Sequence, residues 1–265
     1  MRFASLGSGS EGNALVVEAG AGAARTRVLL DCGFGLRECE RRLERLDVAP
    51  SSLAAIFVTH EHGDHVGGVE RLARKYRIPV WMTHGTFVAS RIGGVGAIKA
   101  AIDIEINLVD THTPLVLGEL EIVPFPVPHD AREPAQFVFG DGACRLGLLT
   151  DAGSLTAHMQ AVLSGLDALV LECNHDAAML EGGPYPASLK ARVGGRYGHL
   201  DNGQAGELLG RLRHAGLQHV LAAHLSRQNN TPALARAALS AALGCGTDWI
   251  GIADQDHGFD WRDIV

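Results

Sequence analysis

The first third of the chain alternates short apolar runs with turn-forming residues. Apolar runs rich in branched side chains predict strands at residues 2–6, 14–19, 27–31, 54–59 and 79–83. Apolar side chains at helical spacing among charged ones predict helices at residues 36–46 and 66–76. This part of the chain is therefore predicted to consist of strands with two intervening helices.

The remainder of the chain continues the same alternation. Strands are predicted at residues 104–109, 115–124, 135–139, 145–150, 168–172 and 220–223. Helices are predicted at residues 202–214 and 232–243, and the second of these begins directly after Thr231. Strands in both halves, each accompanied by helices, predict two sheets packed together and covered on the outside by helices. With no repeat, low-complexity tract or obvious linker, we expect one domain over residues 1–265.

Composition narrows the class of protein. The 265 residues are 46% hydrophobic and carry a formal charge of −7, so the whole molecule does not attract nucleic acid, although bound divalent cations would reverse the field locally. Five scattered cysteines with no C-x-x-C pair argue against a disulfide framework. No secretory signal and no apolar run of membrane-spanning length is visible. We expect a cytoplasmic protein that does not enter the membrane.

A glycine motif near the start imitates a dinucleotide-binding fingerprint. Gly7, Gly9 and Gly12 satisfy G-x-G-x-x-G after a strand, and Asp31 follows about 20 residues later. That motif requires a helix to begin at the glycines, with its amides facing a pyrophosphate. The segment that follows is NALVVEA, which predicts a second strand. The glycines are therefore predicted to form a hairpin.

The strongest chemical signal is THEHGDH, which follows an apolar strand. His60, His62, Asp64 and His65 place imidazole nitrogens and a carboxylate in a short loop, and these donors bind zinc, manganese or iron. The H-x-H-x-D-H spacing lets two histidines reach one cation and the Asp-His pair a second one. A solvated polar turn is the alternative, but such a turn rarely gathers so many ligand-type residues beside a buried strand.

Two cations require more donors than this loop supplies. His129, Asp151 and His224 each stand where a predicted strand ends. Loops after strand ends converge at one edge of a layered fold, which is where active sites lie. A lone residue of this kind is more often a cap, but beside the loop cluster we expect all three to be ligands. Asp151 is suited to bridge the two ions, since each carboxylate oxygen can bind one of them.

Together these residues resemble the metallo-β-lactamase superfamily, and more narrowly its YycJ/WalJ-type members, which are related to ribonuclease Z and to the cyclic phosphodiesterases of phosphonate breakdown. The resemblance covers nearly the whole chain. Its marks are GSGSEGN, LLDCG, VTHEHGDH, PHD, TDAG, LECNHD, GHLDN and AAHLSRQNN. It implies an α/β (α+β) fold, a four-layer αββα sandwich.

The resemblance also implies roles for single residues. It places one group of ligands on the first metal, one on the second, and Asp151 between them. The first group is His60, His62 and His129, and the second is Asp64, His65 and His224. By similarity to ribonuclease Z, His199 is implied to be a catalytic imidazole and Glu172 the carboxylate that orients it.

The implied chemistry is hydrolysis with two divalent ions. Zinc or manganese is the expected metal, and iron is the next alternative. Two nearby cations polarise a phosphoryl oxygen and lower the pKa of a shared water. His199 suits protonation of the leaving alkoxide because imidazole titrates near neutrality, and the alternative is a surface histidine. Asp64 is expected to be indispensable for turnover.

Other polar residues near the motifs could contact substrate. Ser8, Ser10 and Asn13 could donate hydrogen bonds to a phosphate, or they could only shape the hairpin. Asn174 and His175 could touch substrate, or they could only form a turn.

The leading interpretation is a phosphodiesterase that acts on nucleic acid or a small nucleotide-like ester, and an exonuclease is one form of it. Hydrolysis of a lactone, thioester or β-lactam is an alternative on the same fold. Redox chemistry is a further alternative, but it would require iron and a flavin-bearing partner. The chain could also be a non-catalytic metal-binding interaction protein, but such a protein would be expected to have lost some of the candidate ligands. The molecule is expected to be a monomer or a homodimer.

Overall fold

Two sheets form the centre of the molecule. The computed structural model describes residues 1–92 and 103–265, and within them the strands form two seven-stranded sheets. The first sheet contains, in spatial order, β14 (Phe259–Asp263), β1 (Arg2–Gly7), β2 (Ala14–Ala19), β3 (Thr26–Leu30), β4 (Ala55–Phe57), β5 (Val80–Met82) and β6 (Ile106–Leu108). The second contains β13 (Gly251–Ile252), β12 (His219–Ala223), β11 (Ala168–Glu172), β10 (Arg145–Leu149), β9 (Ala135–Gly140), β8 (Leu120–Pro126) and β7 (Leu115–Leu117).

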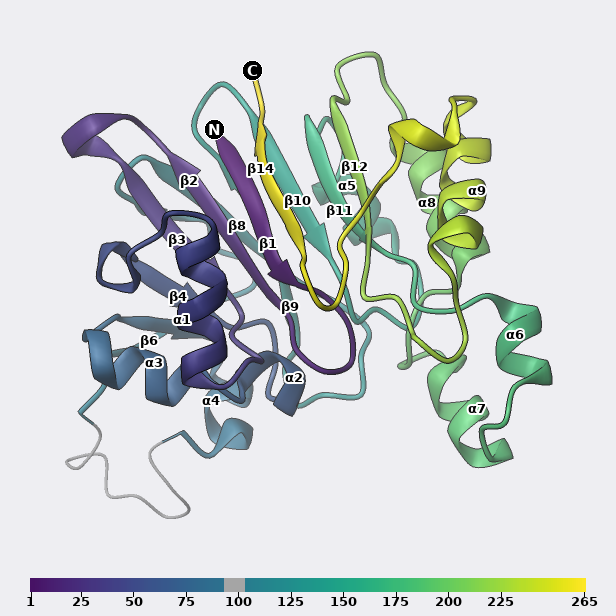
Figure 1. The fold of residues 1–265 in the computed structure, drawn as a ribbon, viewed down its shortest axis with the longest axis horizontal. Coiled ribbons are helices and arrows are strands. Elements are labelled where there is room, and N and C mark those ends of the chain that lie inside the picture. Colours follow the sequence, from purple (N-terminus) through teal and green to yellow (C-terminus); the bar gives the residue numbers. More distant parts are fainter. Residues whose placement is uncertain (93–102) are drawn as a thin grey trace.

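Helices cover the outer face of each sheet (Figure 1). On the first sheet lie α1 (Leu36–Arg45), α2 (Gly63–Val66), α3 (Val69–Tyr76) and α4 (His84–Ser90). With the second sheet belong α5 (Ala157–Val162), α6 (Ala177–Gly182), α7 (Ala187–Val193), α8 (Asn202–Leu212) and α9 (Pro232–Leu243). The predicted αββα layering is confirmed.

Three apolar clusters hold the layers together. Between the sheets, fully buried rings such as Phe57 and Phe137 pack edge to face, with ring centroids 5.5 Å apart. A second cluster joins the first sheet to α1 and α3, and a third joins the second sheet to α5, α8 and α9. Each layer therefore buries one face of a strand or helix against the next.

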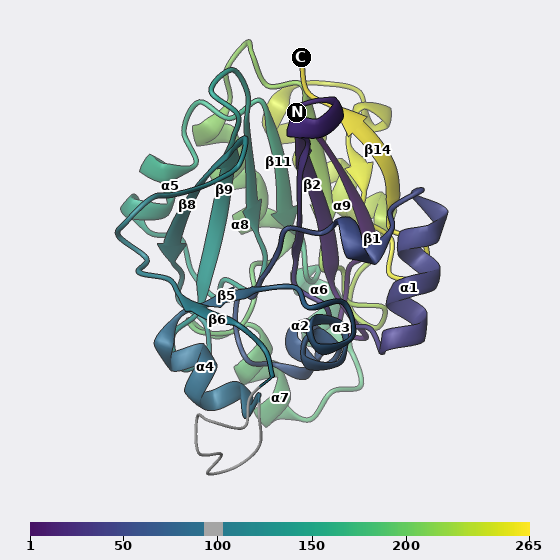
Figure 2. The same cartoon turned by 90° about the vertical axis from the view of Figure 1, so that its left-hand side faces the viewer.

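Strand direction places the chemistry at one edge. Strands β3, β4 and β5 run parallel, as do β10, β11 and β12, so the carboxyl ends within each set meet. Both chain termini lie at the other end of the molecule, where β1 pairs with β14 (Figures 1 and 2). The loops after the parallel strands are thus free to form a site opposite the termini.

Two elements that were predicted to be continuous are each divided into two in the structure. The strand expected at 115–124 is a hairpin, since β7 and β8 are antiparallel and joined by Gly118 and Glu119. The helix expected at 66–76 is broken between α2 and α3. A side chain at Gly68 would overlap the backbone carbonyl of Phe34, so the chain at this point packs too closely for a regular helix surface.

Other boundaries follow the capping chemistry. Thr231 accepts a hydrogen bond from Leu234 N at 3.2 Å, which confirms the predicted start of α9. Asp201 and Gln204 form a capping box at the start of α8, two residues after His199. Helices α4, α5, α6 and α7 and strands β13 and β14 were not predicted, because they are short and lack a long apolar period.

The remaining expectations concern glycine, cysteine and the membrane. The G-x-G-x-x-G segment joins the antiparallel strands β1 and β2, so the hairpin is confirmed and the dinucleotide motif is excluded. All five cysteines are free. Among the described residues, no helix combines the length and apolar character that crossing a membrane requires.

Candidate metal centre

The seven predicted ligands meet at the edge where the parallel strands end. His60 follows β4, while Asp64 and His65 lie in the short helix α2. His62 is the N-cap residue of α2. The remaining three stand on loops of the second sheet, after β8, β10 and β12, and they are His129, Asp151 and His224. Residues up to 164 positions apart in the sequence are thereby brought into one cluster.

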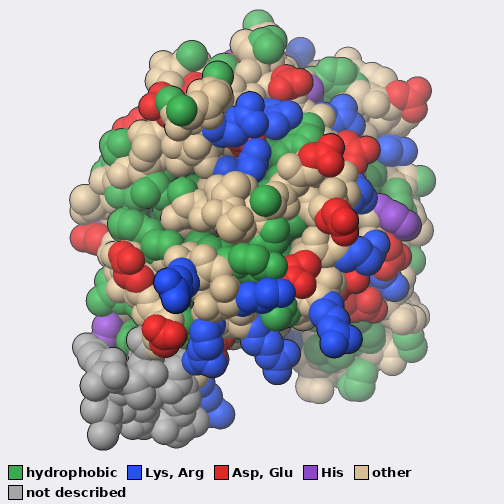
Figure 3. All heavy atoms as spheres, turned by 60° about the vertical axis from the view of Figure 1, so that its left-hand side comes forward, with side chains coloured by type: hydrophobic (Ala, Val, Ile, Leu, Met, Phe, Trp, Pro, Cys, Tyr) green, Lys and Arg blue, Asp and Glu red, His purple; other side chains and the backbone are tan. Residues whose placement is uncertain are grey.

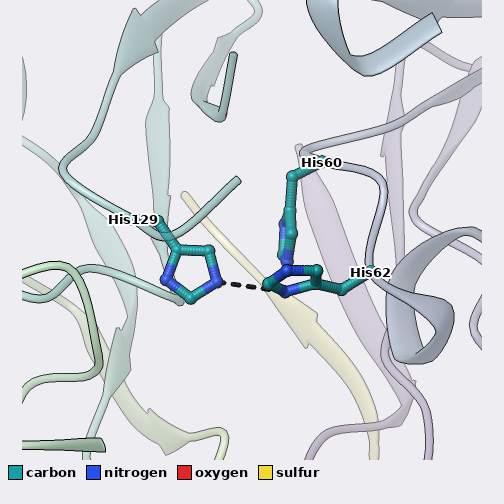
Figure 4. Close-up of side chains that lie close together, drawn as sticks. All are labelled: His60, His62 and His129. Carbon is teal, nitrogen blue, oxygen red and sulfur yellow. Dashed lines mark hydrogen bonds between the residues drawn. The ribbon is translucent and has the colours of Figure 1, made fainter. Parts of the chain in front are cut away.

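The first group contains three imidazoles. His60, His62 and His129 face one another, with ring centroids 4.6–5.0 Å apart (Figure 4). His129 Nε2 lies 3.3 Å from His62 Nδ1. His129 Nδ1 donates a hydrogen bond to Gly198 O at 3.1 Å, which leaves the lone pair of Nε2 directed at the group. Three nitrogens therefore converge as ligands of one cation would.

The second group adds carboxylates. Asp64 Oδ2 lies 3.4 Å from His224 Nε2 and 3.5 Å from His65 Nε2. Asp151 stands between the two groups. Its Oδ2 is 3.2 Å from His65 Nε2, and its Oδ1 is 3.5 Å from His224 Nε2 and 3.9 Å from His129 Nε2. Asp151 therefore occupies the place that a bridging carboxylate requires.

The cluster leaves two buried polar atoms without a hydrogen bond. Among the described residues, His60 Nε2 and Asp151 Oδ2 have no hydrogen-bonding partner although both are buried. Leaving such atoms unpaired costs free energy unless something else binds them. Imidazole nitrogens and carboxylate oxygens in this arrangement fit a divalent cation, and no thiolate takes part. The residues thus fit the metal that the sequence predicted.

The pKa shifts of the clustered side chains also fit a bound cation. Burial lowers the pKa of His65, but the charges of Asp151 and Asp31 outweigh this effect and raise the pKa well above its usual range. Burial raises the pKa of Asp151, but the charges of His224 and His65 outweigh it and hold the pKa well below its usual range. Buried carboxylates here demand nearby positive charge, which a divalent cation supplies without protonating the imidazoles.

Asp31 is a site residue that the sequence analysis missed. Its Oδ2 lies 2.8 Å from His65 Nδ1 and accepts a hydrogen bond from Thr59 Oγ1 at 2.9 Å. Its Oδ1 accepts from Thr59 N at 2.8 Å. A carboxylate on Nδ1 fixes the ring and leaves Nε2 facing the other residues of the cluster. The strand-end rule that identified His129 could have found Asp31, which was weighed only as part of the glycine motif.

Three residues of the cluster hold an unusual backbone conformation. Asp31, Asp151 and His224 have φ of 61°, 53° and 54°, in the left-handed region that non-glycine residues rarely adopt. Each follows a strand of the two sheets. Such strain persists only where the surrounding structure holds it and gathers at functional sites. It turns these side chains back towards the shared edge.

Glu172 and His199 form a pair beside the cluster. Glu172 Oε1 lies 2.8 Å from His199 Nδ1, and His199 Nδ1 is 3.5 Å from Asp151 Oδ1. Burial lowers the pKa of His199, but the charge of Glu172 and the hydrogen bond outweigh it, so the pKa is raised. His199 lines a cavity of about 290 Å³ together with Asp64, Asp151 and His224. The imidazole is thus placed to exchange a proton with a bound molecule.

The five predicted substrate contacts separate into two kinds. Ser10 is exposed and lines the cavity. Ser8 is buried and donates to Asn13 Oδ1 at 3.0 Å, and His224 N donates to Ser8 Oγ at 3.0 Å. Asn13 Nδ2 lies 3.1 Å from His65 Nε2. Ser8 and Asn13 therefore support the ligand loops, while Ser10 faces the space above them.

Asn174 and His175 lie behind the cluster. Asn174 Nδ2 donates to His224 O at 3.1 Å, and Asn174 Oδ1 is 3.2 Å from His175 Nδ1. Both side chains are buried and neither lines the cavity. Their contacts are with the ligand loop rather than with open space.

Comparison with known proteins supports the motif-based resemblance. A family model described as β-lactamase superfamily domain matches residues 26–224. The exodeoxyribonuclease YycJ of Bacillus anthracis is 34% identical over 262 residues, which cover 98% of this chain and 96% of the relative. The exodeoxyribonuclease WalJ of Streptococcus pneumoniae is 30% identical over 254 residues, which cover 94% of this chain and 92% of the relative.

Solved structures agree on the fold. The metallo-β-lactamase fold protein YhfI of Bacillus subtilis superposes with a TM-score of 0.73 at 17% identity, over 99% of both chains. That likeness shows the fold, and the predicted metallo-β-lactamase fold is confirmed. The matched residues and the full-length relatives show that this chain belongs to the β-lactamase superfamily.

Proposed function

We propose that this protein is a dinuclear metal-dependent phosphodiesterase that cleaves nucleic acid from an end. The observation that carries the proposal is the Glu172–His199 pair beside a cluster of seven candidate ligands. Hydrolysis of a phosphodiester expels an alkoxide, which leaves slowly without a proton. Relatives that align over nearly the whole chain are named exodeoxyribonucleases, which supports DNA as the substrate.

The ligand residues define what the centre would hold. His60, His62 and His129 would bind one cation, and Asp64, His65 and His224 a second, with Asp151 between them. Zinc or manganese suits this mixture of nitrogen and oxygen donors, and iron is the next alternative. When bound, such cations supply Lewis acidity and a nucleophile from water at neutral pH.

The protein's own groups complete the reaction. His199 stands on the cavity wall and gives its proton to the oxygen that departs. Glu172 holds His199 through Nδ1, so Nε2 is the nitrogen that faces the substrate. The charge of Glu172 stabilises the protonated imidazole before transfer, because its pKa is held at about 2 and it stays ionised at neutral pH.

A substrate panel with metal analysis tests the proposal. The wild type should hydrolyse bis(p-nitrophenyl) phosphate and shorten linear DNA, and a chelator should stop both until zinc or manganese is restored. Asp64→Asn should remove activity and bound metal together. Asp248→Asn, an exposed carboxylate after α9, is the control and should behave as wild type. Hydrolysis of a lactone, thioester or β-lactam without cleavage of any phosphodiester would contradict the proposal.

A further inference from the structure

The broad face over α1 and α3 is a poor candidate for holding a nucleic acid strand. Basic and acidic side chains both occur on it, and hydrophobic side chains separate several of them (Figure 3). Several of its basic groups are paired within the protein, with Arg41 on Glu38 and Lys75 on Glu40. A polyanion would have to displace these carboxylates, so this face gives no continuous positive track.

The segment that leads to His199 differs in charge. Between Gly182 and Leu200 it carries Lys190, Arg192 and Arg196 and no acidic residue, in a chain whose net charge is −7. It includes α7, which lies with α2 at the end of the molecule opposite the termini (Figure 1). This basic segment therefore lies at the end of the molecule that also carries the candidate metal centre.

Arg192 is the member of this segment that reaches the cavity. Among the described residues that line it, Arg192 is the one lysine or arginine, and Asp64, Asp130 and Asp151 are the carboxylates. Arg192 Nε donates to Asp130 Oδ2 at 2.6 Å. Within the described residues, its two terminal nitrogens make no hydrogen bond, and its side chain is 62% exposed. A guanidinium held through Nε presents these two nitrogens as a fork.

Asp130 fixes where that fork stands. Its Oδ1 lies 3.5 Å from His129 Nε2 and 3.9 Å from His62 Nε2, while Oδ2 holds Arg192. The carboxylate therefore separates the guanidinium from the first ligand group. Asp130 N also donates to Tyr197 O at 2.9 Å, which ties the basic segment to the ligand loop. Arg192 thus lines the cavity and is separated from the cluster by the side chain of Asp130.

We propose that Arg192, held by Asp130, binds a phosphate next to the one being cleaved, so that the site prefers a nucleic acid strand to an isolated phosphodiester. The inference rests on the proposed function and adds the feature of the substrate that is recognised. A guanidinium fork matches two phosphate oxygens, and the pairing is charge-assisted. Contacts to phosphate position a strand without reading its sequence.

Kinetics with two substrates provide the first test. Arg192→Gln should raise KM for a single-stranded oligonucleotide about ten-fold or more, because a hydrogen-bonded charge is lost. Bis(p-nitrophenyl) phosphate has one phosphate, so its kcat/KM should fall at least several-fold less. Arg211→Gln is the matched control, since Arg211 pairs with Glu207 on α8 outside the cavity. Equal losses on both substrates would show that Arg192 only braces Asp130 and would overturn the inference.

Binding without catalysis provides the second test and does not depend on activity. With metal-loaded His199→Ala protein, in which cleavage is slow, fluorescence anisotropy compares an oligonucleotide with versions in which one phosphate at a time is a neutral methylphosphonate. In this background one position should weaken binding, and adding Arg192→Gln should make binding insensitive to that position. Arg192→Gln should also reduce the slope of log affinity against log salt by about one.

The two tests separate the two proposals. A wild type that cleaves no phosphodiester but shows the coupling between Arg192 and one phosphate would refute the proposed reaction and keep the phosphate contact. Cleavage of DNA with no coupling at any position would keep the reaction and remove Arg192 from strand binding.

Discussion

Glu172 Oε1 lies 2.8 Å from His199 Nδ1, and Glu172 Oε2 accepts hydrogen bonds from Ala152 N at 2.9 Å and Leu200 N at 3.2 Å. One buried carboxylate therefore joins the loop after Asp151 to the loop that carries His199. Both loops come from the second sheet but are far apart in the sequence. The position of the imidazole relative to the candidate metal centre is consequently set by Glu172.

His199→Ala is expected to make hydrolysis depend strongly on the leaving group. Alkyl esters leave as basic alkoxides and need a proton, so they should slow by about 10²–10⁴. Nitrophenyl esters leave without one and should slow far less. The measurement is kcat for a series of phosphodiesters that differ in leaving-group pKa. Equal losses across the series would remove His199 as the general acid.

Glu172→Gln is expected to reduce activity about 10–100-fold, because it removes the charge that supports His199. If the carboxylate acts through the imidazole, the double variant Glu172→Gln/His199→Ala should be no slower than His199→Ala alone. Losses that add fully would mean that Glu172 has a separate role, such as holding the loop of Asp151. Metal content of each variant should be measured alongside to identify that outcome.

The sequence was enough to predict the layers and to select candidate ligands that lie together in the structure, for two different physical reasons. His60, His62, Asp64 and His65 are adjacent in the chain, so their density is visible without a fold. The more distant candidate ligands required the rule that parallel strands end at a common edge. The structure brings all of them together, as that rule predicts.

Asp130 and Arg192 escaped this reasoning. Asp130 appeared only within the motif PHD, and Arg192 lies in a short helix flanked by glycine and proline, where no apolar period marks an element. Their role in the proposal depends on the hydrogen bond between them, which joins residues 62 positions apart in the sequence. Neither composition nor motif spacing reveals such a contact. Sequence patterns are therefore least informative about the contacts of short segments that pack against the two sheets.

Metal removal is expected to lower the thermal stability of the protein. An ion that binds only the folded state at about 100 times its Kd contributes about 2.7 kcal/mol, which corresponds to a fall of roughly 5–10 °C in Tm on chelation. The shift should vanish in His65→Ala. It should persist in His158→Ala, an exposed histidine on α5. A wild-type Tm indifferent to both EDTA and added metal would contradict a resident metal.

Gly33→Ala is expected to disturb the second ligand group. A side chain at Gly33 would overlap the backbone carbonyl of Asp64, which also accepts a hydrogen bond from Asn13 N at 2.8 Å. The loop of Asp64 must then shift, at a cost of about 1–3 kcal/mol of stability and with loss of bound metal. Gly35→Ala is the control, because a side chain there meets no atom within 4 Å. Similar metal content in both variants would refute the steric argument.

Glu18 joins three strands far from the candidate centre. In register across the first sheet, it lies between Arg2 of β1 and Arg27 of β3. Its Oε1 accepts from Arg2 Nε at 2.7 Å and its Oε2 from Arg27 Nε at 2.8 Å. Burial raises the pKa of Glu18, but the two arginines outweigh it and the pKa is lowered.

Glu18→Gln is therefore expected to destabilise the fold in a pH-dependent way. A lowered pKa in the folded state means that the stabilisation is present above the unfolded pKa, about 4.3, and is lost as the pH falls below it. At pH 7 the variant should lose about 1.5–3 kcal/mol in urea unfolding, and the gap to wild type should close towards pH 3. Glu44→Gln, an exposed carboxylate on α1, should show neither effect. A gap that stays constant between pH 7 and pH 3 would mean that packing, rather than the charge of Glu18, stabilises these strands.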